Sequence, residues 1–170
     1  MTNLPIALAT IVATLAAREP SSKEKLTDRG LAAAAAALEV SAGNHKFLGD
    51  DVESRAALLL AWSYFESGWQ PCAVGDAGRS LGIMQVNVGW LGKDPKRILC
   101  DTRAGYTEGL KVLDAMVEQC GTPRRALVAY AAGSCKSHLP KVNFYATSRW
   151  SLAGLPKDRL DVRWEPLKVD

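Results

Sequence analysis

The chain has 170 residues, a length that suits a single domain with a sizeable hydrophobic core. Hydrophobic residues make up 48% of the sequence and charged residues 23%, which is ordinary for a globular protein in water. The net charge of +3 is too small to indicate a nucleic-acid-binding protein. It is compatible with approach to an anionic polymer such as a cell wall, but does not require it.

The N-terminal part predicts two helices. Residues 4–17 are uncharged and mostly apolar, but a membrane span needs about 20 such residues. We therefore expect a helix after Pro5 that packs on this protein or on a partner. An uncleaved export signal is the alternative, although no Lys or Arg precedes the apolar run. After a break at residues 19–22, the segment 23–40 predicts a second helix, because its alanine run favours helix and permits close packing.

The next predicted helix contains residues 56–65, an uncharged run rich in Ala and Leu. Its length and composition favour a buried helix over a strand. Gly49, Asp50 and Asp51 precede this run and supply the N-cap, and Gly68 is a stop signal.

Glu66 ends this helix beside Trp62, Phe65 and Trp69. A carboxyl group in such apolar surroundings is poorly solvated, so its pKa should be raised. A carboxylic acid that stays protonated near neutral pH can act as a general acid. The alternative is a helix-end glutamate on the surface.

The glycine-rich segment 69–82 predicts a loop or a small hairpin. It contains Asp76, a second carboxylate of interest, whose alternative interpretation is a simple turn residue. Residues 89–103 predict a further loop, and residues 109–120 show the apolar face of a helix.

Near the C-terminus, Thr122 and Pro123 are a helix start, and residues 126–132 predict a short buried helix that carries Tyr130. Residues 150–170, with prolines, tryptophans and mixed charge, predict an extended tail that could dock on a partner.

Three short motifs resemble the signatures of the soluble lytic transglycosylase and goose-type lysozyme family. They are Glu66-Ser67, Gly82-Ile-Met-Gln85, and Ala129-Tyr130 with Gly133. The resemblance covers residues 52–145 and rests on the order and spacing of the three motifs. It implies a mainly α fold of the α+β lysozyme-like kind, in which a helical domain carries a small loop or hairpin that floors a glycan cleft.

The resemblance also implies roles for single residues. Glu66 would be the catalytic acid, and Asp76 would position a water molecule in a goose-type hydrolase. A second goose-type aspartate is replaced here by Asn87, and the Asn that usually follows the motif tyrosine is replaced by Ala131. The substrate-binding residues that we expect are Ser67, Ser80, Gln85, Asn87, Tyr130 and, by a looser match, Tyr145.

The four cysteines, at positions 72, 100, 120 and 135, allow three pairings, and none forms a CxxC motif. We predict the pairs 72–100 and 120–135, which would suit an oxidising periplasm or a virion. The alternative is four free thiols in a cytosolic protein. His45 and His138 stand alone without ligand spacing, so we expect no metal site and a surface or structural role for both.

The resemblance implies an enzyme that cleaves the β-1,4 bond between N-acetylmuramic acid and N-acetylglucosamine without metal or cofactor. A lytic transglycosylase is favoured, and a goose-type lysozyme or a non-catalytic structural virion protein is the alternative. We expect a helical extension at 1–48, the lysozyme-like domain at 49–150 and a tail at 151–170. The expected partners are peptidoglycan glycan strands and other virion or envelope-machine proteins, but no nucleic acid. The expected location is a virion, the periplasm or the extracellular cell-wall space.

Overall fold

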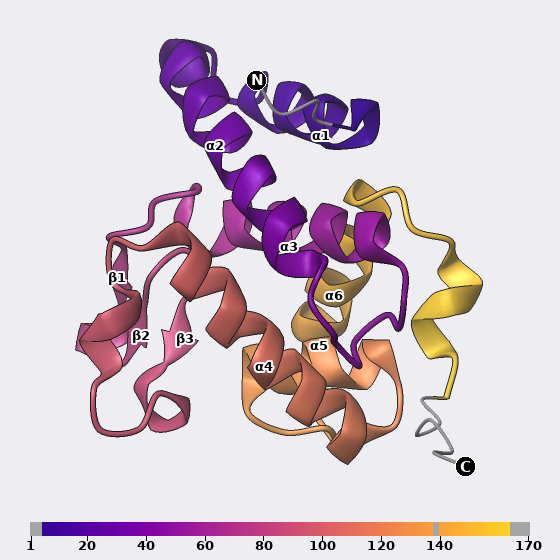
Figure 1. Cartoon of the computed structure of the whole chain (residues 1–170). Helices are drawn as coiled ribbons and strands as arrows, with labels where there is room; N and C mark the ends of the chain where they lie inside the picture. The colour runs from indigo at the N-terminus through magenta and orange to yellow at the C-terminus, as the bar shows by residue number, and fades with distance from the viewer. Residues whose placement is uncertain (1–4, 138–139, 164–170) are drawn as a thin grey trace.

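A computed structural model describes residues 5–137 and 140–163. The described chain is mostly helical, with one small sheet, so the predicted mainly α class with a small hairpin is confirmed (Figure 1). The α-helices are α1 (Ile6–Ala16), α2 (Lys23–Ser41), α3 (Val52–Ser67), α4 (Thr102–Cys120), α5 (Pro123–Ala132) and α6 (Pro140–Leu152). The strands are β1 (Val74–Gly75), β2 (Ser80–Leu81) and β3 (Val86–Asn87). Short 3-10 helices are η1 (Pro20–Ser22), η2 (Asp76–Gly78), η3 (Val88–Trp90), η4 (Pro95–Ile98) and η5 (Lys157–Asp161).

Helix α3 is the centre of the core. Its residues from Arg55 to Ser63 are all buried, and α1, α2 and α6 pack against it. The Asp51 side chain accepts a hydrogen bond from the backbone N–H of Ser54, and Gly68 ends the helix in a left-handed conformation with φ 59°. The predicted buried helix, its cap and its stop are therefore confirmed, and Glu66 lies in the last turn.

The N-terminal helices cover one side of α3 (Figure 1). The predicted packing of α1 on this protein is confirmed, because Leu8, Val12 and Leu15 are buried. At Gly30 in α2, an added Cβ would lie 2.6 Å from Val12 and 2.7 Å from the Trp69 ring, so glycine permits this close approach. Among the residues that the structure describes, no helix combines the length and the hydropathy that crossing a membrane requires.

The predicted small hairpin is present as a sheet with strand order β1-β2-β3, in which both pairs are antiparallel. Gly75 pairs with Ser80, and Ser80 pairs with Asn87. The turn between β1 and β2 is left-handed at Asp76 and Ala77, with φ values of 49° and 54°. The sheet therefore brings residues 76–87 to one side of the end of α3.

Helix α4 begins at Thr102, whereas the sequence predicted a loop up to residue 103 and a helix only from residue 109. Asp101 caps the helix by accepting from the N–H of Ala104. Gly105 and Gly109 weaken the helical signal, yet both are needed for packing: an added Cβ would lie 2.9 Å from Ile83 at one and 2.9 Å from Met84 at the other. Close contact with the sheet segment therefore outweighs the low helix propensity of glycine.

The prediction of an extended C-terminal tail is wrong for residues 150–163. These residues finish α6 and then fold back through η5, with Trp150 and Leu160 fully buried. The Trp150 indole donates to the carbonyl of Pro156 at 2.9 Å, and Arg124 pairs with Asp161 at 2.7 Å. The rest of the predicted tail, residues 164–170, lies outside the described residues.

Both predicted disulfides are confirmed, Cys72–Cys100 and Cys120–Cys135. The first ties the segment before the sheet to the segment before α4, and the second ties the end of α4 to the segment after α5. The structural role of His45 is also confirmed, because its Nδ1 lies 2.9 Å from Asp114 and the residue is half-buried. His138 lies outside the described residues.

Replacing Cys120 and Cys135 together by serine is expected to lower the free energy of unfolding by about 3 kcal/mol, because the bond closes a loop of 15 residues in the unfolded chain. Denaturant unfolding of the oxidised parent and the variant would measure this difference. The control is the same comparison under reducing conditions, in which the parent loses both disulfides and the variant loses Cys72–Cys100, so the two proteins should have similar stability. Equal midpoints of the oxidised parent and the oxidised variant would contradict the expectation.

Candidate active site

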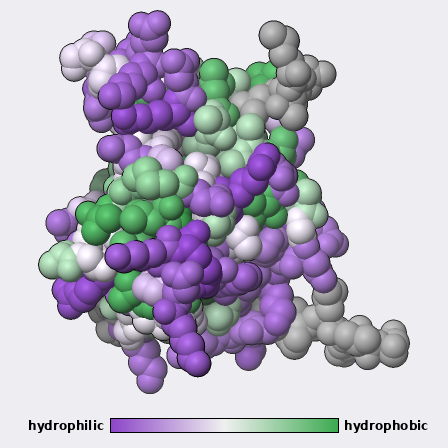
Figure 2. All heavy atoms as spheres, turned by 60° about the vertical axis from the view of Figure 1, so that its left-hand side comes forward, coloured by the Kyte–Doolittle hydropathy of each residue, from purple (hydrophilic) through white to green (hydrophobic). Residues whose placement is uncertain are grey.

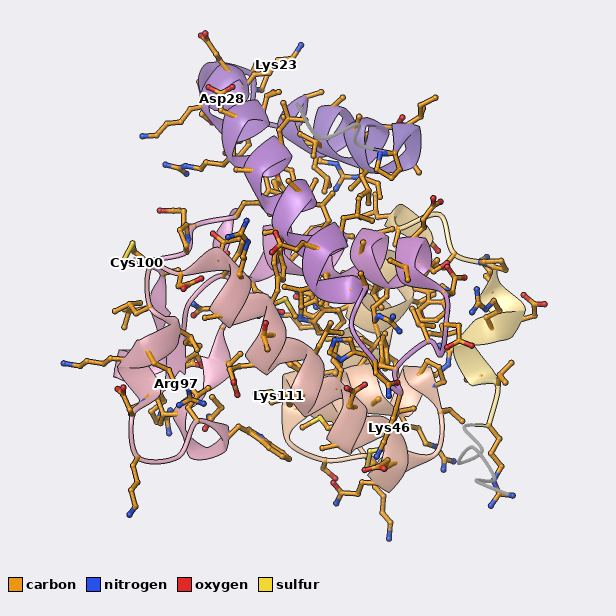
Figure 3. The ribbon with its side chains drawn as sticks, viewed as in Figure 1. Lys23, Asp28, Lys46, Arg97, Cys100 and Lys111 are labelled. Carbon is orange, nitrogen blue, oxygen red and sulfur yellow. A yellow bond between two sulfur atoms is a disulfide. The ribbon has the colours of Figure 1, made fainter. Side chains whose placement is uncertain are left out.

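A cleft of about 590 Å³ opens where the end of α3 meets the sheet, α5 and α6. Of the predicted site residues, all except Ser67 line it. The lining residues are Glu66, Asp76, Ser80, Gln85, Val86, Asn87, Trp90, Val112, Met116, Ala129, Tyr130, Ala131, Ala132, Gly133, Tyr145 and Arg149. The fold therefore brings together residues that lie far apart in the sequence. Figure 3 shows the density of side chains where these elements meet.

Glu66 is the largely buried carboxyl group of the cleft, with 22% of its side chain exposed. Burial raises its pKa, and the charge of Asp76 acts in the same direction, whereas the charge of Arg149 opposes both. The raised pKa agrees with the expectation from the apolar surroundings. One part of that expectation is wrong, because Trp69 packs against Tyr64 and the Gly30 region of α2, on another side of α3.

Arg149 of α6 contacts Glu66, and the sequence analysis missed it. Its Nη2 lies 3.2 Å from Glu66 Oε1, and the Arg149 side chain is only 9% exposed. The guanidinium lies over three aromatic rings, 4.4 Å from the centroid of Trp62, 5.2 Å from that of Phe65 and 5.3 Å from that of Tyr145. Tyr145 and Arg149 are four residues apart, so they lie on the same face of a helix. The sequence could have indicated Arg149 only if α6 had been predicted.

Asp76 lies on the rim of the cleft and is exposed. Its Oδ2 accepts a hydrogen bond of 2.6 Å from the hydroxyl of Ser80, which is buried. Ser80 therefore orients the second carboxylate, whereas the sequence suggested contact with the sugar or with the acid. The left-handed turn at Asp76 and Ala77 places the carboxylate back toward β2, within reach of this hydroxyl.

Gln85 stabilises the floor of the cleft. Its amide nitrogen donates to the carbonyls of Gly82 at 2.9 Å and Ala73 at 3.2 Å, so the backbone is its partner and Glu66 is not. A Cβ at Gly75 would lie 2.2 Å from Gln85 Oε1, which explains glycine at this position. Asn87 is exposed, and its side-chain oxygen accepts from the N–H of Gly89 at the start of η3.

The two tyrosines lie in the wall of the cleft. The Tyr130 hydroxyl donates to the carbonyl of Met84 at 2.9 Å, and its ring meets Trp62 edge-on at 5.7 Å. Burial, and secondarily the charge of Glu66, raises the pKa of Tyr130 well above its ordinary value, so the phenol stays protonated. Tyr145 is half-buried and lies against Arg149.

Ser67 lies outside this cleft. Its hydroxyl is 2.8 Å from the carbonyl of Ile83 and accepts a hydrogen bond from the N–H of Gln70. These contacts attach the end of α3 to the segment that carries Gln85, so they fix the position of Glu66 relative to the cleft floor.

Trp90, on η3, is a cleft residue that the sequence did not single out. Its side chain is 48% exposed, although a tryptophan normally reads as a core residue. Exposed aromatic rings beside a cleft offer a flat apolar surface with a polar edge. Nothing in the local sequence distinguishes this tryptophan from the buried ones.

If the cleft binds glycan, as the family resemblance implies, Trp90→Ala is expected to raise the half-saturating concentration of a soluble glycan oligomer about tenfold, because one aromatic contact of roughly 1–1.5 kcal/mol is lost. Trp90→Phe should restore most of the affinity. The matched control is Phe144→Ala, since Phe144 is 67% exposed but does not line the cleft. Equal effects of the Trp90 and Phe144 variants would contradict a role of Trp90 in binding.

In the described part of the chain, no group of His, Cys, Asp or Glu side chains is arranged to hold a metal ion. The carboxyl groups that line the cleft are Glu66, with a raised pKa and a cation beside it, and Asp76 at the rim.

Residues 46–152 match the family model described as the transglycosylase SLT domain. The match covers more than half of the chain and includes every residue that lines the cleft. The helices α1 and α2 lie outside it. Searches of curated proteins and of solved structures give no match.

Proposed function

The chain belongs to the transglycosylase SLT-domain family, and on this premise we propose that it is a lytic transglycosylase that cleaves the β-1,4 bond between N-acetylmuramic acid and N-acetylglucosamine. Peptidoglycan cleavage of a transglycosylase-like kind follows from the family. The choice of this bond, of the products and of the residue roles is our proposal. The observation that carries it is Glu66, a largely buried carboxyl group with a raised pKa that lines the cleft beside Arg149.

In the first step, protonated Glu66 donates its proton to the oxygen that joins the two sugars. The bond between that oxygen and the muramyl anomeric carbon breaks, and positive charge develops on the muramyl ring. The Glu66 carboxylate that forms lies beside the Arg149 guanidinium, which stabilises its negative charge. Burial thus raises the pKa of Glu66, and Arg149 lowers it. This balance favours both the release and the uptake of a proton by Glu66.

In the second step, the Glu66 carboxylate takes the proton from the 6-hydroxyl of the muramyl residue. The 6-oxygen attacks the anomeric carbon and closes a 1,6-anhydro ring, and Glu66 regains its initial protonated state. The cycle therefore needs one carboxyl group. Trp62, Phe65 and Tyr145 surround the guanidinium and hold it in place while the charge of Glu66 alternates.

A goose-type hydrolase is the second candidate, and Asp76 is the observation that favours it. Asp76 lines the same cleft and is oriented by Ser80, so it could position a water molecule. An inverting hydrolase needs such a base at roughly 6.5–9.5 Å from the acid. The position of the second goose-type aspartate holds Asn87, which caps η3, and this departure favours the transglycosylase.

Mass spectrometry of the soluble products from purified peptidoglycan distinguishes the two candidates. A transglycosylase releases anhydro-muramyl ends, and its Asp76→Asn variant should keep most of the activity, within about threefold. A hydrolase releases reducing ends, and the same variant should lose at least about a hundredfold. No product from several wall types would favour a third possibility, a structural protein that retains the fold without activity.

We also propose that the protein works in an oxidising, wall-facing setting, either in a virion or in an envelope-penetrating machine. Two disulfides in a chain of 170 residues support this setting, because such bonds are rare in reducing compartments. Thiol labelling of the native protein before and after reduction would check it. Four thiols that are labelled without reduction would contradict the proposal.

A further inference from the structure

A second depression, of about 530 Å³, lies between the start of α2 and the end of α3. Glu66 lines this depression as well as the main cleft, so the two adjoin at the proposed acid. The remaining lining residues are Glu19, Ser22, Lys25, Leu26, Arg29, Tyr64, Phe65, Ser67, Gly68 and Gln70. Those before residue 46 lie outside the family match, so this depression is a feature that the N-terminal helices add to the domain.

The cations of this depression are available to a ligand. Lys25 and Arg29 are four residues apart on α2 and share one helix face. Within the described residues, neither side chain forms a hydrogen bond or an ion pair, although Arg29 is half-buried. Other arginines are paired. These pairs are Arg97–Glu108, Arg103–Glu39, Arg124–Asp161, Arg149–Glu66 and Arg159–Asp51.

The acidic residue at the edge of the depression is already engaged. Glu19 accepts a hydrogen bond from the Tyr64 hydroxyl at 3.2 Å and one from Ser22 at 3.3 Å. An apolar surface lies beside the cations, because the Phe65 ring is 41% exposed there. Figure 2 shows hydrophilic side chains covering the start of α2, at the top of the view. A ligand with carboxylates on a partly aliphatic chain would suit both features.

We propose that this depression binds the acidic peptide stem of the muramyl residue whose glycosidic bond is cut. The inference rests on the proposed function. The stem leaves the muramyl ring through the lactyl group on C3, on the same ring as the anomeric carbon whose bond Glu66 would protonate, so the stem begins within one sugar ring of the junction of the two cavities. Its carboxylates would pair with Lys25 and Arg29, and its aliphatic parts would lie against Phe65. The N-terminal helices thereby select glycan strands that still carry peptides.

The test compares two substrates, peptidoglycan with intact stems and glycan strands from which an amidase has removed the stems. The double variant Lys25→Gln/Arg29→Gln is expected to cleave stem-bearing material about tenfold more slowly and stem-free strands at the parent rate. The control is Lys23→Gln/Lys157→Gln, which removes the same charge from exposed positions outside the depression. Lys23 lies at the outer end of α2 in Figure 3. Arg29→Lys in place of Arg29→Gln should recover part of the loss.

The unmutated protein supplies a second measurement. Raising the ionic strength should bring the rates on the two substrates closer together, because exposed charge pairs are screened. If the Lys25 and Arg29 substitutions slow the cleavage of both substrates equally, the depression does not bind the peptide stem. That result would favour a binding site for more of the glycan strand. If the parent is active and the double variant has the same ratio of rates on the two substrates as the parent, the peptide-stem inference is overturned and the proposed function is not. A parent that cleaves neither substrate would overturn the proposed function and this inference with it.

Discussion

Glu66→Gln is expected to reduce peptidoglycan cleavage by about 10³-fold, because an amide cannot donate the proton that the leaving oxygen needs. The fold should be retained. A neutral side chain of the same shape avoids the burial of a carboxylate that raises the pKa of Glu66 in the parent, but it leaves the buried Arg149 guanidinium without its counter-ion. Because these two effects on stability oppose each other, thermal unfolding of the variant near neutral pH should remain close to the parent temperature.

The measurement is the release of soluble muropeptides from purified walls, followed over time for both proteins. The control is Glu53→Gln, which changes an exposed glutamate in the first turn of the same helix. It should leave the rate within about twofold of the parent. Residual activity of Glu66→Gln above a tenth of the parent value would exclude Glu66 as the general acid.

The pH dependence of the parent follows from the same group. The first step needs protonated Glu66, so activity falls as the pH rises through its pKa. Because that pKa is raised, chiefly by burial, the fall should begin at a higher pH than for an exposed glutamate.

Arg149→Met is expected to have the second-largest effect. It removes the cation beside Glu66 and keeps an unbranched apolar side chain between the rings of Trp62 and Phe65. Without the cation, the pKa of Glu66 rises further, since burial and the charge of Asp76 then act unopposed. The alkaline limb of the pH–rate profile should move to higher pH, and the maximal rate should fall because the carboxylate intermediate loses its counter-ion.

The stability of Arg149→Met should also depend on pH. A glutamate whose pKa is raised on folding contributes stability below its unfolded pKa, and this contribution is lost as the pH rises through the folded pKa. At pH 8, where more of the carboxyl group is ionised than at pH 5, the variant leaves this buried charge without a partner, and a loss on the order of 3 kcal/mol is expected. At pH 5, where more of the carboxyl group is protonated, the loss should be clearly smaller.

Chemical unfolding at both pH values would measure this difference. The double variant Glu66→Gln/Arg149→Met is the control, because without the carboxyl group the pH dependence of the loss should disappear. Parallel pH profiles of the Arg149→Met variant and the parent, in activity and in stability, would show that Arg149 acts through packing and not through its charge on Glu66.

Local rules were sufficient to predict the helix that carries the acid and the position of the acid on it. An uncharged run rich in Ala and Leu, a capping Asp51 and a terminating Gly68 determine α3 without reference to distant residues. The hairpin that holds Asp76 and the helix start at Pro123 follow from turn and cap chemistry in the same way. The family resemblance also indicated seven of the sixteen residues that line the cleft.

Local sequence rules gave wrong predictions for the start of α4 and for the C-terminal segment, because packing against distant residues determines both structures. Gly105 and Gly109 lower the helix propensity of the first half of α4, yet they allow Ile83 and Met84 to approach the helix closely. The C-terminal segment has little helical or strand pattern of its own, and the burial of Trp150 and Leu160 determines its course. These contacts join parts of the chain that are distant in sequence, so no local pattern reveals them.

The sequence by itself therefore predicted the fold class and the place of Glu66 at the end of α3, because caps, apolar runs and motif order act over short distances. The disulfide pairs that the structure contains were one of the three pairings that the sequence allowed. Only the tertiary structure decided the electrostatic surroundings of Glu66. It placed Arg149 against Glu66, directed Ser80 to Asp76 and joined Gln85 to the backbone. It also set the cations of α2 beside the acid. The physical reason is that a pKa and a binding surface depend on distance and burial, which are set only when remote segments pack together.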